Sequence, residues 1–170
     1  MIYRVYCDGS TRGNGQENAV GAWAYVIVNS EYESMSRADV QAVSGTTNQR
    51  MELQAAIEAI KAALPLCEKG DIIQIYTDSA YLHNCYKQKW YENWQKNGWK
   101  NAKKQPVAND DLWKELIPYF DTFGIEFYKV KGHTAGTTNH EMWNNYVDEL
   151  AQNASARKKM EEEKNGNSNH

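Results

Sequence analysis

Four carboxylates in the chain stand where acidic side chains could act together. Asp8 precedes Gly9 at the end of a strand pattern, and Asp78 closes a short apolar segment in the same way. Because adjacent parallel strands end at one edge of a sheet, we expect these two side chains to lie close together. Glu52 borders the apolar stripe of a helical segment, and Asp148 lies within another. Taken singly, each residue is equally consistent with a turn, a cap or a solvated helix position.

Carboxylates that converge in this way repel one another unless cations neutralise them. Hard oxygen ligands favour Mg²⁺ or Mn²⁺, whereas the lack of Cys or paired His ligands argues against zinc. Two such ions about 3.5 to 4 Å apart can activate a water on one side of a phosphodiester and stabilise the leaving 3′ oxygen on the other. The four residues therefore indicate hydrolysis without a covalent nucleophile.

The elements that must position these residues follow from the hydrophobic period. Val-, Ile- and Tyr-rich stretches predict strands, and apolar residues spaced by three and four predict helices. We expect strands at 2–7, 20–28, within 32–44, 72–77 and 125–131, and helices from Asn48 to Pro65, after Ser79, after Asn109 and across 143–154. This order predicts an α/β fold with a mixed five-stranded sheet and helices on both faces.

Length and composition bound the class of protein. The chain has 170 residues, 41% hydrophobic and 24% charged, which is typical of one globular domain, here 1–155, with a polar, frayed tail at 156–170. A net charge of −3 argues against binding a polyanion over the whole surface. Three cysteines without metal-ligand spacing, no signal peptide and no long apolar stretch predict a cytoplasmic monomer that does not contact a membrane.

Around the carboxylates, five motifs in register closely resemble type 1 ribonuclease H of the bacterial kind with a basic protrusion. The motifs are Cys-Asp-Gly-Ser at 7–10, Thr-Thr-Asn-Gln-Arg-Met-Glu-Leu at 46–53, Tyr-Thr-Asp-Ser at 76–79, Lys-Gly-His at 131–133 and Val-Asp-Glu-Leu-Ala at 147–151. The resemblance covers residues 1 to about 155. It implies the ribonuclease H-like fold and an endonuclease that hydrolyses the RNA strand of RNA–DNA hybrids, leaving 5′-phosphate and 3′-hydroxyl ends.

The same resemblance implies roles for the site residues. Asp8 would bridge two ions, Glu52 and Asp78 would bind one of them, and Asp148 the other. His133, in a glycine-flanked loop, would carry protons or assist product release, although an exposed loop histidine is the alternative reading. Fifteen residues separate His133 from Asp148 where about ten are usual in the family, so the loop is longer here. Asn144 matches an asparagine near the site in the family.

Recognition of an RNA strand requires contacts to its 2′-hydroxyls, which neutral amides can both donate to and accept from. The position-matched amides are Asn14, Asn48 and Gln49. Asn14 is also consistent with a turn, and Asn48 with a helix N-cap. Thr47 and Asn109 match the family's pocket for a DNA phosphate, but Gly45 stands where an arginine is common. We therefore expect a weaker pocket here.

Residues 87–104, termed the handle below, concentrate positive charge. Six lysines against Glu92 leave +5 on a chain that is negative overall. The lysines are Lys87, Lys89, Lys96, Lys100, Lys103 and Lys104, and the interleaved aromatics are Trp90, Trp94 and Trp99. Basic residues alternating with aromatics are typical of nucleic-acid surfaces, and Trp90 matches an aromatic that packs on deoxyribose in the family. An amphipathic helix with its Trp residues in the core is the alternative.

Two other functions remain open from the sequence. A hybrid-binding module with weak catalysis would share most motifs, but the complete set of four carboxylates counts against it. A transposase or integrase core would use the same fold and metal chemistry on duplex DNA. The candidate 2′-hydroxyl contacts and His133 favour ribonuclease H.

Overall fold

The computed structural model describes residues 1–168 and contains one five-stranded sheet of order β3-β2-β1-β4-β5. Its strands are β1 (Ile2–Arg12), β2 (Val20–Asn29), β3 (Ser34–Ser44), β4 (Ile72–Thr77) and β5 (Ile125–Lys129). The helices are α1 (Asn48–Ala63), the short 3₁₀ turn η1 (Leu64–Leu66), α2 (Ala80–Gln88), α3 (Trp90–Lys96), α4 (Asp110–Phe120) and α5 (Asn139–Ser168). Antiparallel and parallel pairs both occur, so the predicted mixed α/β sheet is confirmed.

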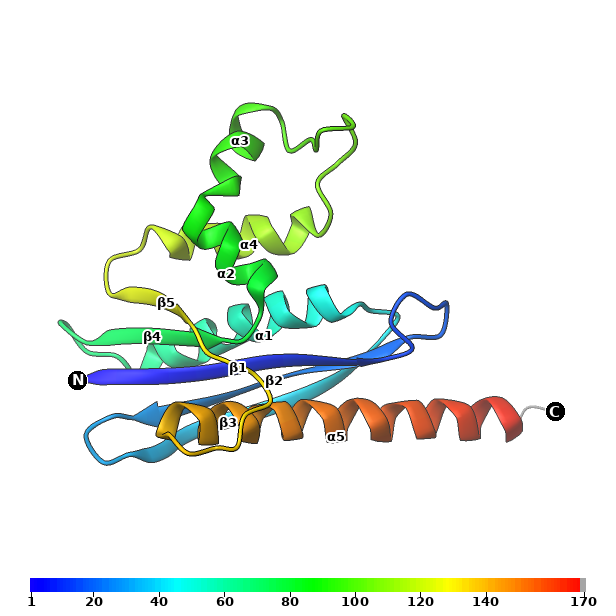
Figure 1. Cartoon of the computed structure of the whole chain (residues 1–170), viewed down its shortest axis with the longest axis horizontal. Helices are drawn as coiled ribbons and strands as arrows, with labels where there is room; N and C mark the ends of the chain where they lie inside the picture. The colour runs from blue at the N-terminus through cyan, green and yellow to red at the C-terminus, as the bar shows by residue number, and fades with distance from the viewer. Residues whose placement is uncertain (169–170) are drawn as a thin grey trace.

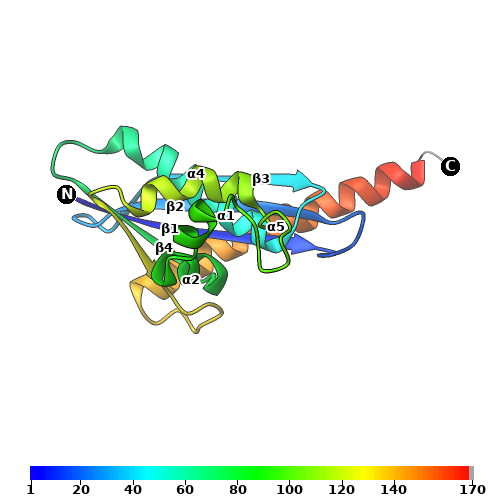
Figure 2. The ribbon, with the colours of Figure 1, turned by 90° about the horizontal axis from the view of Figure 1, so that it is seen from above.

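Helices cover both faces of this sheet. Alternation along β1 sends Val5 and Cys7 into a core with α1 and α4, whereas Tyr6 packs with Val147 of α5. Figures 1 and 2 show α1, α2 and α4 on one side of the strands and α5 on the other. The expectation of helices on both faces is confirmed.

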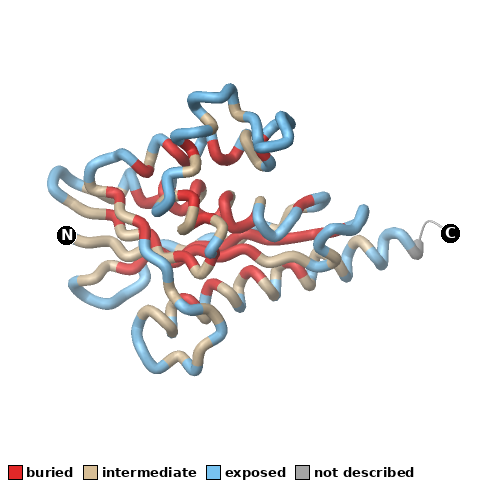
Figure 3. Tube along the Cα trace, turned by 45° about the horizontal axis from the view of Figure 1, so that its top comes forward, coloured by how far each residue is buried: buried red, intermediate tan, exposed pale blue. Residues whose placement is uncertain are grey.

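The central strands and the inner face of α1 form the core. Nine of the ten residues of β2 are buried, while β3 lies at the sheet edge with a mostly exposed pattern. Figure 3 shows the buried residues gathered along these strands and the helix beside them. On α1, Leu53, Ile57 and Ile60 are fully buried. Each such side chain contributes about 1.5 to 3 kcal/mol of stability, so the helix that carries Glu52 is firmly held.

The position of Asp8 differs from the sequence prediction. Asp8 does not end its strand, because β1 continues to Arg12 by pairing with β2. Only the parallel pairing with β4 stops, at the pair Cys7 and Thr77. Asp78 thus follows the end of β4, directly beside a strand that runs on. The gap left by β4 opens the sheet next to Asp8.

The last helix is longer than predicted. Instead of fraying from residue 156, the described part of the tail is helical to Ser168. Lys159 Nζ donates to the carbonyl oxygen of Asn18 at 2.9 Å, and the Ser44 hydroxyl bonds to the Glu162 carboxylate, so the extension has tertiary partners. Despite its 30 residues, α5 is polar, and no helix within the described residues has the length and hydrophobicity to cross a membrane.

Candidate active site

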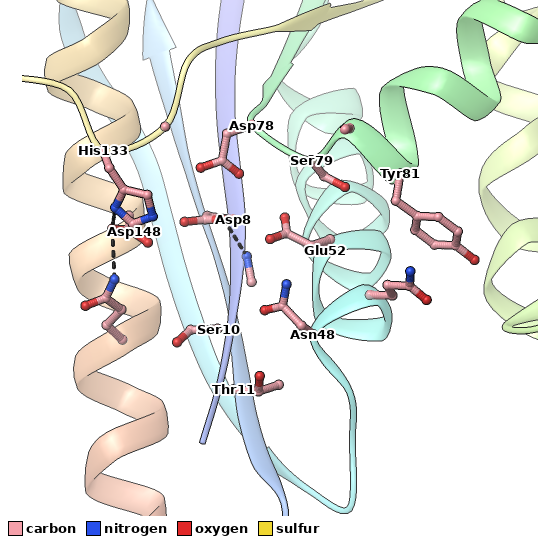
Figure 4. A pocket seen from close by; sticks show the side chains of 15 residues that line it. Asp8, Ser10, Thr11, Asn48, Glu52, Asp78, Ser79, Tyr81, His133 and Asp148 are labelled. Atoms are coloured by element: carbon pink, nitrogen blue, oxygen red, sulfur yellow. Dashed lines mark hydrogen bonds and ion pairs between the residues drawn. The ribbon is translucent and has the colours of Figure 1, made fainter. Parts of the chain in front are cut away.

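Three carboxylates meet at the opening beside β4. Asp8 on β1, Glu52 on the second turn of α1 and Asp78 after β4 each offer an oxygen within 4.8 Å of the others. Figure 4 shows Asp8 between Asp148 on one side and Glu52 on the other, with Asp78 above it. The side chains therefore come from four separate elements that the fold brings to one place.

These residues line a pocket of about 630 Å³. Of the residues proposed from sequence, it contains Asp8, Asn48, Gln49, Glu52, Asp78, His133 and Asp148. The lining is mostly polar, which suits a charged substrate better than an apolar one. Residues predicted to be catalytic and two of the three amides predicted to contact RNA therefore line one pocket, while their roles stay predictions.

Burial makes the ionised state of the cluster costly. The pKa values of Asp8 and Glu52 are raised, first by burial and then by the neighbouring carboxylates. Asp8 Oδ1 accepts the Gly9 N–H at 2.9 Å, but Asp8 Oδ2 and Glu52 Oε2 are buried without a hydrogen-bond partner. Buried, unpartnered carboxylate oxygens beside a third carboxylate are a donor set for a hard divalent cation.

Asp148 faces the same pocket but stands apart from the group of three. Its Oδ2 accepts a hydrogen bond from Gln152 Nε2 at 3.0 Å and lies 3.7 Å from His133 Nδ1. It still helps to raise the pKa of Asp8, behind burial, Glu52 and Asp78 in size. Three of the four predicted carboxylates are therefore clustered, and the fourth, Asp148, is hydrogen-bonded to Gln152 on its own helix and faces His133.

The loop that carries His133 runs over the carboxylates. The Val130 N–H donates to the Thr77 carbonyl at 2.9 Å, which continues the path of β5 past the end of β4. At Gly132 an added Cβ would lie 2.7 Å from Asp78 Oδ2, so a larger residue there would displace the Asp78 carboxylate. The His133 side chain is 77% exposed, which leaves its ring accessible to substrate.

The amide residues lie at the start of α1. Asn48 and Gln49 line the pocket, and Asn14 Oδ1 accepts the Asn48 backbone N–H at 3.1 Å. The prediction that Asn48 caps α1 is wrong, because the Thr47 hydroxyl accepts the Arg50 N–H at 3.2 Å and makes Thr47 the N-cap. Asn48 therefore keeps its side chain available at the pocket wall.

The residues matched to a phosphate pocket lie outside this cavity. Asn109 Nδ2 donates to the Tyr81 hydroxyl at 3.2 Å, and its Oδ1 accepts from Arg50 Nη1 at 3.3 Å. Arg50 also forms a two-bonded ion pair with Asp111, with Nη2 2.8 Å from Oδ2. The positive charge closest to Asn109 is thus already paired, while Thr47 serves as a helix cap.

Asn144 occupies a different place from the one its match implied. It is 1% exposed, it does not line the pocket, and neither polar atom of its amide has a hydrogen-bond partner. It lies one helical turn before Asp148 on α5. The structure therefore places Asn144 behind the site wall rather than in contact with the cavity.

The handle projects from α2 and α4 beyond the sheet (Figure 1). Lys96, Lys100, Lys103 and Lys104 are all exposed. Trp90, Trp94 and Trp99 are partly buried and pack against the core. Trp90 approaches Tyr81, a pocket residue, with ring centroids 6.3 Å apart. The tryptophans therefore anchor the segment, as the alternative interpretation expects, and nucleic-acid binding by the exposed lysines stays a prediction.

Several pocket residues were not singled out as site residues from the sequence. Those with a polar side chain are Ser10, Thr11, Ser79, Tyr81 and Gln152. The spacing of four residues between Asp148 and Gln152 was the one available signal, because such pairs share a helix face. Ser79 was predicted only as a helix cap, which it is.

Comparison with solved structures first defines the class. The chain is similar to LC9-RNase H1, described as a type 1 RNase H with the type 2 active-site motif, with a TM-score of 0.66 and 28% identity over 91% of this chain and 72% of the other. A foamy viral protease-reverse transcriptase structure with dsDNA shares the fold at a TM-score of 0.72 and 24% identity, covering 90% and 93% of the two chains. The fold is that of a ribonuclease H domain.

Sequence comparison then gives the family. The RNase H family model matches residues 2–156. Ribonuclease H of Syntrophomonas wolfei is 44% identical over 150 residues, covering 88% of this chain and 93% of that protein, and the Clostridium botulinum enzyme is 41% identical with the same coverage. The chain belongs to the ribonuclease H family, whose members generally use a divalent metal.

Proposed function

We propose that this chain cleaves the RNA strand of RNA–DNA hybrids with two Mg²⁺ ions, leaving 5′-phosphate and 3′-hydroxyl ends. The observation that carries the proposal is the pocket in which buried, unpartnered carboxylate oxygens lie beside the amides of Asn48 and Gln49. The first group suits hard cations and the second suits 2′-hydroxyls. Mn²⁺ is the alternative metal with the same ligand preference.

Asp8, Glu52, Asp78 and Asp148 are assigned as the metal ligands. When bound, two such ions supply an activated water and neutralise charge on the leaving 3′ oxygen. Asp8 would help to hold both ions because it lies between Asp148 and Glu52. Glu52 and Asp78 are assigned to one ion and Asp148 to the other. For Asp148 this role requires that its contacts with Gln152 and His133 permit the carboxylate to turn toward Asp8.

His133 is assigned to proton transfer. Its Nδ1 lies 3.7 Å from Asp148 Oδ2, which places the ring beside one of the proposed metal ligands. The exposed ring can take a proton from the solvent side or give one to the departing product. A positioned histidine typically contributes about 10² to 10⁴-fold in rate, so the reaction should slow rather than stop without it.

The RNA strand is assigned to the wall formed by Asn14, Asn48 and Gln49. An amide can donate to one hydroxyl lone pair and accept the hydroxyl proton, which a deoxyribose cannot offer. The DNA strand would lie toward Thr47, Asn109 and Trp90. Because Arg50 is paired with Asp111, we expect the phosphate site at Asn109 to bind weakly.

Hybrid binding is further assigned to the exposed lysines of the handle. They supply the positive charge that a chain with a net charge of −3 lacks elsewhere. Asn144 is assigned a supporting role behind Asp148. We propose that the protein works as a cytoplasmic monomer without a membrane partner.

The decisive experiment compares end-labelled RNA–DNA hybrid, duplex DNA and duplex RNA, each with Mg²⁺ and with EDTA. We expect cleavage of the RNA strand of the hybrid alone, and only with the metal. Asp8→Asn should abolish cleavage and keep hybrid binding, because the variant loses a metal ligand and no packing group. Asp39→Asn, which alters an exposed carboxylate on β3, is the matched control and should cleave normally.

Other outcomes would identify the alternatives. Tight hybrid binding without cleavage by the wild-type chain would indicate a binding module. Cleavage of duplex DNA would indicate an integrase-like nuclease. Cleavage by Asp8→Asn at the wild-type rate would refute the metal assignment.

A further inference from the structure

One face of α5 carries four polar side chains at helical spacing, and the first three of them contact the loop between β5 and α5. The residues are Glu141, Asn145, Asp148 and Gln152. Positions three and four apart lie one above another on a helix, so these form a single stripe. Its last member donates to Asp148, and Asp148 in turn faces His133. The stripe therefore lies along the loop that carries the proposed proton carrier.

The loop is bound to the stripe at its far end. Glu141 Oε2 accepts hydrogen bonds from the Thr137 N–H at 2.9 Å and the Thr138 N–H at 3.3 Å. The Thr138 hydroxyl accepts the Glu141 N–H at 3.1 Å, which completes a reciprocal cap at the start of α5. These bonds fix where the loop enters the helix, five residues after His133.

Asn145 supplies the contact nearest to His133. Its Nδ2 donates to the Thr134 carbonyl at 3.1 Å, one residue beyond the histidine. At Gly136, which has φ +75°, an added Cβ would lie 3.2 Å from the same nitrogen. The loop backbone therefore folds closely over the Asn145 amide.

The loop needs such a contact because its local conformation is not an intrinsically favoured one. His133 has φ 53°, in the left-handed region that side chains rarely adopt. Its imidazole is largely exposed, so packing does not fix it. Without an external bond, the backbone at His133 would relax toward commoner angles, and the ring would move away from Asp148.

We propose that Asn145 is a positioning residue that holds His133 over Asp148. The inference rests on the proposed role of His133 in hybrid cleavage. Asn145 lies outside the pocket lining and does not contact the substrate site itself. Asn145 affects turnover indirectly, because its bond to the Thr134 carbonyl fixes the backbone that orients the His133 ring.

A double-mutant cycle tests this dependence. Asn145→Ala should lower kcat on the hybrid by about 2- to 10-fold, the range expected for loss of one hydrogen bond, with KM unchanged. In a His133→Ala background the same substitution should cause no further loss. Asn153→Ala, an exposed asparagine farther along α5, is the matched control and should leave kcat unchanged in both backgrounds.

A second variant and a second readout exclude a general effect on folding. Asn145→Leu keeps about the same size, adds no charge beside Glu141 and Asp148, and loses the N–H donor, so it should reproduce the kcat defect with a thermal midpoint close to that of the wild type. Amide relaxation by NMR should show greater motion of residues 133–136 in both variants and unchanged motion in the core of α5.

The outcomes separate this inference from the proposed function. An equal loss of kcat in the wild-type and His133→Ala backgrounds would overturn the inference, as would unchanged kcat and unchanged loop motion in both Asn145 variants. Failure of the wild-type chain to cleave hybrid would refute the proposed function instead. In that case, greater motion at 133–136 in the variants would still support the tether, and unchanged motion would refute it.

Discussion

An added Cβ on Gly9 would lie 2.6 Å from the backbone nitrogen of Glu52. Strand β1 and helix α1 thus approach backbone to backbone beside Asp8 and Glu52, whose carboxylate oxygens lie within 4.8 Å of each other. The absence of a side chain at residue 9 permits this approach and so brings the two proposed metal ligands together. A bulkier residue there would displace the backbone of a helix turn, because a change of side-chain rotamer could not relieve the clash.

Gly9→Ala should therefore lower both stability and activity. Overpacking of this kind costs about 1 to 3 kcal/mol of the free energy of unfolding, and α1 must shift away from β1 to relieve it. We expect a loss of hybrid cleavage that added Mg²⁺ reverses only partly. Urea unfolding and a metal titration of the cleavage rate measure the two effects.

Gly166→Ala is the control, since the same substitution on α5 meets open space. It should leave activity unchanged and, as a helical position, should not reduce stability. A Gly9→Ala protein with wild-type stability and rate would show that the close approach does not set the geometry of the ligands.

The carboxylate cluster should make metal-free protein less stable as the pH rises. The pKa values of Asp8 and Glu52 are raised in the folded state. Below pH about 4, the ordinary pKa of a carboxyl group, both side chains are protonated in the folded and the unfolded chain, so they do not reduce stability. Above it, the unfolded chain releases these protons first, and stability falls until the folded groups ionise. Urea unfolding in EDTA from pH 4 to 8 measures this slope.

A variant and a metal titration test whether the carboxylate cluster causes this dependence of stability on pH. Asp8→Asn should flatten it and raise stability near neutral pH in EDTA, because one buried carboxyl no longer ionises. Mg²⁺ should restore the stability of the wild-type chain by binding only the folded state. The exposed Asp39→Asn should behave as wild type. Stability that increases with pH across this range would show that the cluster is not electrostatically strained.

The double variant Asn48→Ala and Gln49→Ala should weaken discrimination between ribo- and deoxyribo-strands. Both residues line the pocket, and truncation removes the amide partners proposed for 2′-hydroxyls. Competition binding with hybrid and duplex DNA gives the ratio of affinities. Gln54→Ala, on the same helix but hydrogen-bonded to Glu58, is the control. An unchanged ratio in the double variant would remove both residues from RNA recognition.

Removal of charge from the handle should reduce the salt dependence of hybrid binding. Each lysine that neutralises a phosphate contributes about −0.9 to the slope of log affinity against log salt for B-form DNA, so losing most of four contacts should flatten it by about two to four units. KM should rise far more than kcat falls. The substitutions, all to Ser, are at Lys96, Lys100, Lys103 and Lys104.

A charge-matched control uses four lysines outside the handle. They are Lys61, Lys69, Lys158 and Lys164, all replaced by Ser. This variant has the same net charge as the handle variant but should keep the wild-type slope. If both variants flatten the slope equally, total charge rather than the handle determines binding.

The sequence predicts the type and order of the elements well because hydrophobic period is a local property. It places Asp8 wrongly at a strand end, since Gly9 and Ser10 resemble a turn. Their real setting depends on β2, which continues the pairing of β1 after β4 stops. The choice between Thr47 and Asn48 as cap was likewise undecidable locally, because both residue types cap helices well.

Site residues that belong to sequence motifs could be predicted, whereas site residues that are placed by tertiary contacts could not. The carboxylates stand in motifs, whereas Tyr81 enters the pocket because α2 packs beside α4, where its hydroxyl accepts from Trp113 Nε1 at 2.9 Å. The helical extension past residue 156 also depends on distant partners, such as Asn18 for Lys159. Such pairings leave no period in the sequence.

The layer formed by α5 has a consequence for synthesis of the protein on the ribosome. Val147 and Ala151 pack on Val26, Val28 and Ala24, which are translated more than a hundred residues earlier. Translation proceeds at about 5 to 20 residues per second, so α5 is synthesised several seconds or longer after the strands on which it packs. During that interval one apolar face of the nascent sheet is open, so chaperone binding should be strongest before α5 leaves the exit tunnel.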